Sequence, residues 1–315
     1  MPEIVAIGEL LVEVMRKEVD RPLDRAADFV GPFPSGAPGI FADQAARLGP
    51  AVGMIGAVGE DGFGDCLINR FAADGLDVSH IARVADVATG VAFVTYFSDG
   101  SRKFIFHIGN SAAGRLPRPD AEWLGSTAWL HICGSTLSAG EAMRRACYAA
   151  CCVVTDAGGK VSFDPNLRPE LLGGEEAVRE VCAPVLGRAS LVLPSAAEAE
   201  VLTGAADPNA ACRELLRGAA EVVVLKRGAA GCRVFGARGE VVEVPAFRVQ
   251  AVDPTGAGDC FDAGFVVGLL EGLPLEQVGR LANACVALGA TRQGPMEGAF
   301  PRAEVETFMG GAAVQ

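Results

Sequence analysis

Short apolar runs alternate along the chain with longer stretches whose apolar residues recur every three to four positions. The short runs are rich in Val, Ile and Leu and have the length of buried strands, whereas the longer stretches show the period of amphipathic helices. Strands are predicted at residues 4–7, 52–57, 128–132, 160–163, 191–193 and 222–226. Helices are predicted at residues 39–48, 63–74, 139–155, 175–186, 196–202 and 208–217. This alternation predicts an α/β fold in which helices cover both faces of a mostly parallel sheet.

The C-terminal part continues the same pattern. Strands are predicted at residues 231–235 and 241–245, and helices at residues 260–271 and 274–290. A Gly-rich turn at residues 253–259 directly precedes the first of these two helices. The sequence thus places a flexible turn at the beginning of a long apolar helix.

Two regions depart from this pattern. Residues 10–16 and 29–34, and residues 89–97 and 102–107, alternate apolar and polar side chains. Such alternation is typical of antiparallel strands that have one face toward solvent. We expect a small antiparallel β sheet, formed by about residues 10–34 and 89–108, to project as a lid from a single domain that spans residues 1–315.

Composition and charge restrict the class of protein. The chain has 315 residues, of which 50% are hydrophobic and 21% charged, so it can bury a full core. Acidic residues outnumber basic ones 39 to 27 and give a net charge of −12, which argues against nucleic acid as a partner. No apolar run has the roughly 18 to 20 residues of a membrane span, and residues 1–10 lack the features of a signal peptide. We expect a cytoplasmic protein with no membrane partner.

The 10 cysteines are scattered and lie mostly within apolar segments, so they are interpreted as reduced core residues. The sequence contains no C-x-x-C pair, and its 3 histidines have unrelated spacings. A zinc site is therefore not expected.

The strongest chemical signal is the string D-P-T-G-A-G-D-C-F-D-A-G-F at residues 253–265. Its small residues Gly256, Ala257 and Gly258 allow backbone N–H groups to converge at a helix N-terminus, which binds anions such as phosphate. The carboxylate of Asp259 at the rim is suited to accept a hydroxyl proton while these donors stabilise a transferring phosphoryl group. The simpler interpretation is that Asp259 only caps the helix.

Two common nucleotide-binding motifs are absent from the sequence. Gly159-Lys160 has no Gly five positions earlier and is followed by Val161, so it is not a Walker-type P-loop. No G-x-G-x-x-G occurs, so a nicotinamide-binding Rossmann domain has little support.

The string at residues 253–265 resembles the C-terminal signature of the PfkB, or ribokinase-like, family of carbohydrate kinases. Further segments match the order of the family's motifs over nearly the full length: Gly8–Glu13, Ser35–Ala42 with Arg47–Gly49, Val58–Gly64, Asp164–Pro169, Ser195–Glu198 with Leu202–Gly204, and Val224–Gly231. The resemblance implies a ribokinase-like three-layer α/β/α fold with a mostly parallel central sheet and a small antiparallel β lid. It also implies an ATP-dependent sugar kinase.

The resemblance assigns roles to individual residues. Asp259 is the expected catalytic base, with the backbone of Gly256, Ala257 and Gly258 as the anion hole. The expected sugar-binding residues are Glu13, Gly36, Asp43, His107, Asn166 and Arg168. The expected nucleotide-binding residues are Ser195, Lys226, Gly228, Gly231 and Asn283. Glu198 is expected to act on Mg²⁺ indirectly, through water.

Taken alone, several of these residues have simpler interpretations. These are solvated surface positions for Glu13, Asp43, Glu198 and His107, and an ion pair with Asp164 or Glu170 for Arg168. A solvated helix face is the default interpretation of an acidic side chain in a helix.

Departures from the family pattern bear on the sugar. Ser35 replaces the first Gly of the second motif, and Ile40 stands where the family has a substrate-contacting Asn. In the similar 2-keto-3-deoxygluconate kinases a basic residue holds the carboxylate of the acid, whereas the corresponding positions here are Ile108 and Gly109. We therefore predict a neutral ketohexose, of the fructose or tagatose type, and keep the keto-acid as the alternative.

Two further classes share the fold: a nucleoside kinase, and a sugar- or nucleotide-binding regulator that has lost catalysis. The segment Asp164–Arg168 matches the sugar branches, and the complete string around Asp259 argues against a lost activity. The resemblance implies ATP and Mg²⁺ as cofactors and leaves open a monovalent cation such as K⁺. Because lids of this kind often pair between subunits, we expect a homodimer that forms through the β lid.

Overall fold

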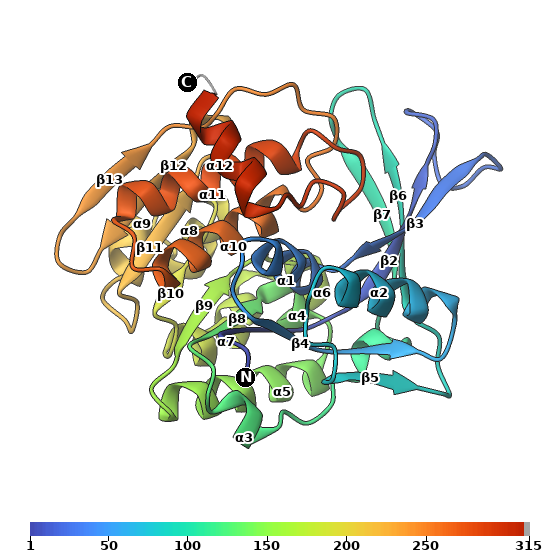
Figure 1. The fold of residues 1–315 in the computed structure, drawn as a ribbon, viewed down its shortest axis with the longest axis horizontal. Coiled ribbons are helices and arrows are strands. Elements are labelled where there is room, and N and C mark those ends of the chain that lie inside the picture. The colour runs from blue at the N-terminus through green and yellow to red at the C-terminus, as the bar shows by residue number, and fades with distance from the viewer. Residues whose placement is uncertain (312–315) are drawn as a thin grey trace.

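The computed structural model describes residues 1–311, which form two sheets flanked by helices (Figure 1). Among these residues the larger sheet has nine strands, in the order β13-β12-β11-β10-β9-β8-β1-β4-β5. The strands are β1 (Ile4–Ile7), β4 (Val52–Gly59), β5 (Ile81–Val84), β8 (Trp129–Cys133), β9 (Lys160–Asp164), β10 (Leu191–Val192), β11 (Val222–Lys226), β12 (Cys232–Gly236) and β13 (Val241–Val244). Only the pairs β11·β12 and β12·β13 of this sheet are antiparallel, so the predicted mostly parallel sheet is confirmed.

Helices cover both faces of the larger sheet and give three layers. One face carries α1 (Ala37–Arg47), α2 (Gly62–Ala73), α10 (Ala257–Leu270), α11 (Leu275–Gly289) and α12 (Arg302–Gly311). The other carries α3 (Ala121–Leu124), α4 (Gly134–Ser138), α5 (Glu141–Asp156), α6 (Pro169–Leu172), α7 (Glu175–Leu186), α8 (Ala196–Thr203) and α9 (Pro208–Leu215). Each layer has its own core, because alternate strand residues face opposite sides: Ile4 and Ala6 join the first core, Val5 and Ile7 the second.

The structure differs from the predicted elements in a few places. The helix predicted at residues 139–155 is α5, which begins at Glu141 after Gly140 at φ 142°, and the short helix α4 that precedes it was not predicted. Helix α10 begins at Ala257, three residues before the prediction, because the Gly-rich turn already leads into it. The elements β5, α3, α6 and α12 were not predicted, since each is short or buries few side chains.

The small sheet contains β3 (Phe29–Ser35), β2 (Leu11–Arg16), β6 (Gly90–Tyr96) and β7 (Arg102–His107), in that order. It stands at one side of the molecule, at the right of Figure 1. Its outer pairs β2·β3 and β6·β7 are antiparallel as predicted, but the central pair β2·β6 is parallel. The two predicted hairpins are therefore joined into a mixed sheet by a parallel pair that local sequence patterns do not indicate.

Gly134, at the start of α4, permits a close approach between two chain segments at the edge of the larger sheet. A Cβ atom at this position would lie 1.8 Å from the carbonyl oxygen of Pro165, which follows β9. Gly62, at the start of α2, has no atom within 4 Å of the corresponding position.

We predict that Gly134→Ala destabilises the protein by at least about 2 kcal/mol, because two backbones must move apart to admit the methyl group. Gly62→Ala is the matched control and should leave stability unchanged or slightly raised. Thermal unfolding of both variants checks this. Equal melting temperatures for the two variants would show that the contact at Gly134 does not constrain the fold.

Candidate active site

The carboxyl ends of β1, β8, β9 and β11 meet at one edge of the larger sheet because these strands run parallel. Strand β1 lies between β4, which follows it in the sequence, and β8, to which the chain returns later. This arrangement is a topological switch point, the place where open α/β sheets bind ligands. The residues that follow these strand ends, Glu9 and Asn166 among them, are therefore candidates for the site.

The Gly-rich turn forms the N-terminus of α10. Gly256 has φ 76°, and a Cβ there would lie 2.6 Å from the carbonyl oxygen of Pro295, so the position requires glycine. The carboxylate of Asp253, which is 3% exposed, fixes the turn by accepting hydrogen bonds from the backbone N–H groups of Thr255 (2.9 Å) and Gly294 (3.1 Å).

The turn offers free donors. Within residues 1–311, the backbone N–H groups of Gly258 and Asp259 have no hydrogen-bond acceptor, whereas that of Ala257 donates to the carbonyl of Pro254 at 3.3 Å. A Cβ on Gly258 would meet no atom within 4 Å, so the space beside that residue is open. Free N–H groups at a helix N-terminus attract an anion.

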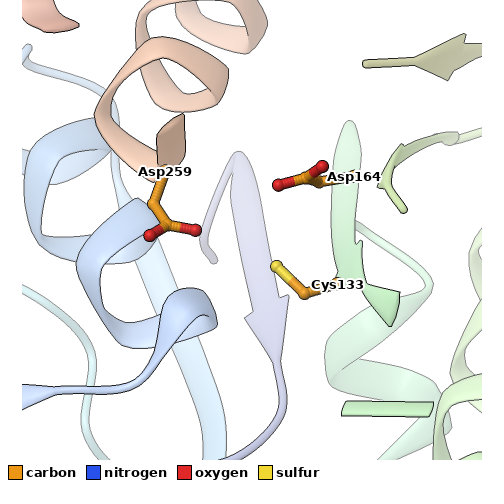
Figure 2. Close-up of side chains that lie close together, drawn as sticks. All are labelled: Cys133, Asp164 and Asp259. Atoms are coloured by element: carbon orange, nitrogen blue, oxygen red, sulfur yellow. The ribbon is translucent and has the colours of Figure 1, made fainter. Parts of the chain in front are cut away.

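Asp259 lies in the first turn of α10 and is 9% exposed. Its carboxylate faces Asp164, at the end of β9, and Cys133, at the end of β8 (Figure 2), with ligand-type atoms of all three within 4.8 Å of one another. Burial, reinforced by the charge of Asp164, raises the pKa of Asp259 well above its usual value, while Lys226 opposes the rise. A raised pKa makes a carboxylate a better proton acceptor near neutral pH.

Lys226 ends β11 with its ammonium group toward these carboxylates. The Nζ atom lies 2.9 Å from Oδ1 of Asp164 and 3.3 Å from both carboxylate oxygens of Asp262 in α10. The structure thus pairs Lys226 with protein carboxylates, although the sequence placed it beside the triphosphate.

Glu13 in β2 is 5% exposed and only partly hydrogen-bonded. Its Oε1 accepts from the Ser35 hydroxyl at 2.7 Å, and its Oε2 is buried with no partner among the described residues. Burial raises the pKa of Glu13 to about 7. The hydroxyl of a ligand can supply the missing donor. Gly36 follows Ser35 at the start of α1, and a Cβ there would lie 2.4 Å from the carbonyl oxygen of Glu9.

Asn166 and Arg168 follow β9 in an irregular segment. Asn166 has φ 35°, a conformation that is rare outside glycine and concentrates at functional sites. The guanidinium group of Arg168 donates to the carbonyls of Leu167 (2.9 Å) and Asn166 (3.3 Å). Its charge lowers the proton affinity of Glu9 and Asp259, so Arg168 lies near both.

Asp43 does not belong to this site. Its carboxylate is fully buried in α1, where Oδ2 lies 3.1 Å from Nη2 of Arg70 and 3.7 Å from Nε of Arg47. Both arginines also bind Asp74. The prediction that Asp43 contacts the sugar is corrected: this side chain ties α1 to α2.

His107 does not face Glu13. Paired strand residues share a face, and Glu13 pairs with Ala92, which pairs with Phe106. His107, the next residue, therefore points to the opposite face of the small sheet, where its ring meets that of Phe93 at 6.1 Å. The prediction that His107 binds the sugar is corrected for a single chain.

A cavity of about 670 Å³ opens beside the end of β11. It is lined by Ser195, Ala196, Ala197, Pro208, Asn209, Leu225, Lys226, Arg227 and Arg233. Arg227 and Arg233 and the N-termini of α8 and α9 favour a negatively charged ligand here. The 3₁₀ turn Gly228–Ala230 and Gly231 follow this strand end directly, so the predicted nucleotide-binding glycines lie next to the cavity wall.

Asn283, another predicted nucleotide-binding residue, is not among the residues that line this cavity. It is 1% exposed in α11, and its Nδ2 donates to the carbonyls of Val244 (3.1 Å) and Pro245 (3.0 Å). The Nδ2 group of Asn283 therefore holds the end of β13, and its contact with the nucleotide stays a prediction.

Glu198 forms a capping box with Ser195 at the N-terminus of α8. One carboxylate oxygen accepts from the backbone N–H of Ser195 at 2.8 Å and the other from that of Leu167 at 3.2 Å. Each oxygen retains a lone pair for water. These contacts fit a carboxylate that acts on Mg²⁺ through water.

Two residues of the small sheet reach the Gly-rich turn, a contact that was not predicted. The hydroxyl of Tyr96 lies 3.1 Å from both carboxylate oxygens of Asp253 and 2.9 Å from the hydroxyl of Thr255. Arg102 donates to the same Thr255 hydroxyl at 2.9 Å. Tyr96 and Arg102 pair across β6 and β7, a register that the sequence does not reveal. Glu9 was also missed; it is 4% exposed and accepts from the Ser135 hydroxyl at 2.8 Å.

Free backbone donors beside a buried carboxylate suit the transfer of a phosphoryl group, and the three-layer α/β/α fold is one in which phosphotransferases occur. The chain belongs to the pfkB family of carbohydrate kinases, whose family model matches residues 1–302. The predicted family and the predicted sugar kinase activity are confirmed.

Known proteins share this architecture. A fructokinase from Klebsiella pneumoniae is 36% identical over 270 residues, which cover 84% of this chain and 87% of the relative. The structure of a provisionally named ribokinase II from E. coli, in complex with ATP and Mg²⁺, superposes with a TM-score of 0.93 at 40% identity and covers 98% and 99% of the two chains. A fructokinase from Vibrio cholerae O395, bound to fructose, ADP and calcium, gives 0.80 at 25% identity, with coverage of 98% and 99%.

In residues 1–311, none of the helices has both the length and the apolar character needed to cross a membrane.

Glu13→Gln tests the partly bonded carboxylate. Because folding raises the pKa of Glu13 from 4.5 to about 7, its protonated form stabilises the fold at low pH, and this contribution is lost as the pH rises through 7. The permanently neutral variant should therefore melt a few degrees higher than the wild type at about pH 8.5, with a smaller difference at about pH 5.5.

The same variant should raise the KM for sugar at least about tenfold, since a ligand hydroxyl loses its acceptor. Asp43→Asn is the control and should leave this KM within about twofold. An unchanged KM in Glu13→Gln would show that Glu13 does not bind the sugar. If the melting temperatures of variant and wild type differ equally at both pH values, the pKa of Glu13 is not raised.

Proposed function

We propose that the protein phosphorylates a neutral ketohexose of the fructose type, using Mg-ATP. The observation that carries this proposal is the buried carboxylate of Asp259 next to free backbone donors at the start of α10. The Klebsiella pneumoniae and Vibrio cholerae relatives are named fructokinases, and the latter binds fructose and ADP. Both names support a ketohexose as the substrate.

In the proposed reaction Asp259 accepts the proton of the attacking sugar hydroxyl. The hydroxyl oxygen forms a bond to the γ-phosphorus as the bond between that phosphorus and the leaving oxygen of ADP breaks. The N–H groups of Gly258 and Asp259 stabilise the charge on the transferring group. Arg102 donates to the Thr255 hydroxyl of this turn. We propose that its positive charge also stabilises the transferring phosphoryl group.

The sugar is held in this proposal by Glu13, the backbone at Gly36, Asn166 and Arg168. Glu13 lacks a partner for one oxygen, and Arg168 lies near both Glu9 and Asp259. Ile108 and Gly109 offer no charge for a carboxylate, so a neutral sugar is favoured over 2-keto-3-deoxygluconate.

We place the phosphates of ATP in the basic cavity at Ser195 and the glycines Gly228 and Gly231 beside it. Mg²⁺ would be held through water by Glu198 and would neutralise phosphate charge. The small sheet acts as a lid that excludes water from the transfer. All 10 cysteines are free thiols, which suits the reducing cytoplasm.

We further propose a homodimer that forms through the outer face of the small sheet. Phe29 is 42% exposed and Ile105 is 48% exposed. Phe93 contacts Phe29 with ring centroids 5.7 Å apart and pairs with Ile105, so the three form an apolar patch opposite Glu13. Apolar patches of this kind are covered in many homodimers.

Asp259→Asn should lower kcat for fructose by about three orders of magnitude while binding of Mg-ADP stays within about threefold, because the proton acceptor is lost and the donors remain. Coupled ADP release and calorimetry measure the two quantities. Asp61→Asn is the matched control, since Asp61 caps α2 by accepting from Phe63 and Gly64. If both variants lose stability but keep kcat, Asp259 is only a helix cap.

The wild-type panel should include tagatose, 2-keto-3-deoxygluconate, ribose and adenosine. Turnover of the keto-acid alone would contradict the argument from Ile108 and Gly109, and turnover of adenosine alone would indicate a nucleoside kinase. If ligands bind but no substrate turns over, the protein is a sugar- or nucleotide-binding regulator and not an enzyme.

Ile105→Asp should convert the dimer to a monomer, because a charge would be buried in an apolar contact. Sedimentation velocity checks the mass. Val241→Asp is the control, since Val241 is 51% exposed on β13, which belongs to the other sheet. A wild-type monomer, or a dimer that survives Ile105→Asp, would rule out this interface.

A further inference from the structure

Lys226 joins three elements of the fold through one buried ion cluster. Its side chain is 17% exposed, that of Asp164 is 5% exposed and that of Asp262 is fully buried. Asp164 ends β9, Asp262 lies one turn after Asp259 in α10, and Lys226 ends β11. The ammonium group thus lies beneath the first turn of α10 and bonds both carboxylates.

The charges in this cluster are unequal. Burial disfavours the ionised form of Asp164, but the charge of Lys226 outweighs burial and holds the pKa of Asp164 below its usual value. Burial and the neighbouring Asp164 raise the pKa of Asp262. The charge of Lys226 thus favours the ionised form of both carboxyl groups, against the cost of their burial.

We propose that Lys226 is a positioning residue, held by Asp164 and Asp262, which compensates the negative charge around Asp259 and is not a ligand of the triphosphate. This inference rests on the proposed role of Asp259 as the base. It concerns a different interaction, because Lys226 is proposed to offset the negative charge near Asp259 and not to contact the nucleotide.

The ionisable groups around Asp259 come from every element packed at this edge. They are Glu9 after β1, Cys133 on β8, Asp164 on β9, Arg168 after β9, Lys226 on β11 and Asp262 on α10. Acidic groups predominate, and the cations are Lys226 and Arg168. Loss of the ammonium group would leave the ionised Asp164 facing Asp259 without its partner.

The test compares Lys226→Gln with the double variant Lys226→Gln/Asp164→Asn. Since kcat/KM requires ionised Asp259, the single variant should move the acid limb of the pH profile to higher pH by about one unit or more. The double variant removes both charges of the pair and should return the limb to within about half a unit of the wild type. Binding of Mg-ADP, measured by calorimetry, should stay within about twofold in both.

Two results would overturn the proposal. One is a loss of Mg-ADP affinity of about tenfold or more in Lys226→Gln with the acid limb unmoved, which would make Lys226 a nucleotide ligand. The other is an unmoved limb with unchanged affinity, which would leave Lys226 no role at the site. If Lys226→Gln does not fold, Asp164→Asn alone should move the limb to lower pH, and an unmoved or raised limb contradicts the proposal.

A second readout does not depend on turnover. Carboxyl ¹³C NMR of the protein, with the Asp259 signal identified by its absence in Asp259→Asn, reports the titration of this group directly. The signal should titrate at higher pH in Lys226→Gln than in the wild type. Absence of sugar turnover would therefore refute the proposed function, while an Asp259 titration that is unchanged in Lys226→Gln would refute only the role of Lys226.

Discussion

The centre of this molecule depends on the pairing of a partly buried ammonium group with buried carboxylates. Ions that leave water are stabilised inside a protein only when an opposite charge and hydrogen bonds replace the lost hydration. Lys226 meets this requirement for Asp164 and Asp262 and in doing so fixes α10 against the ends of β9 and β11. This attachment holds the N-terminal part of α10, with the open space beside Gly258, at the carboxyl ends of β9 and β11.

Most of the larger sheet could be predicted because its strands are buried on both faces and are apolar along their whole length. Helices with a wide apolar face, such as α7, were also predicted with the correct bounds. Elements that contribute little to a core, such as β5 and α12, carry no comparable periodicity. The parallel pairing of β2 with β6 depends on contacts between segments far apart in the sequence, and alternation alone cannot distinguish it from antiparallel pairing.

The candidate site divides in a similar way. Asp259 and its glycines lie in one contiguous string, so sequence alone could place them at a helix N-terminus. The positions of Asp43 and His107 depend on which helix or sheet face a side chain occupies, and the sequence does not reveal that face. Tyr96 and Arg102 lie more than a hundred residues from the turn that they contact, and no local pattern connects them with Thr255.

The alternation of side chains along β7 has a consequence for how this family member can change during evolution. Phe106 lies on the face that carries Glu13, and the adjacent Ile105 lies on the exposed apolar face. Insertion or deletion of a single residue within the strand would exchange the two sets of side chains and spoil both surfaces at once. Changes of length are therefore tolerated in the turn between β6 and β7, whereas the strand itself can vary only by substitution. The register of β7 therefore sets both faces of the small sheet at once, so the sugar-facing surface and the apolar surface cannot change in length independently.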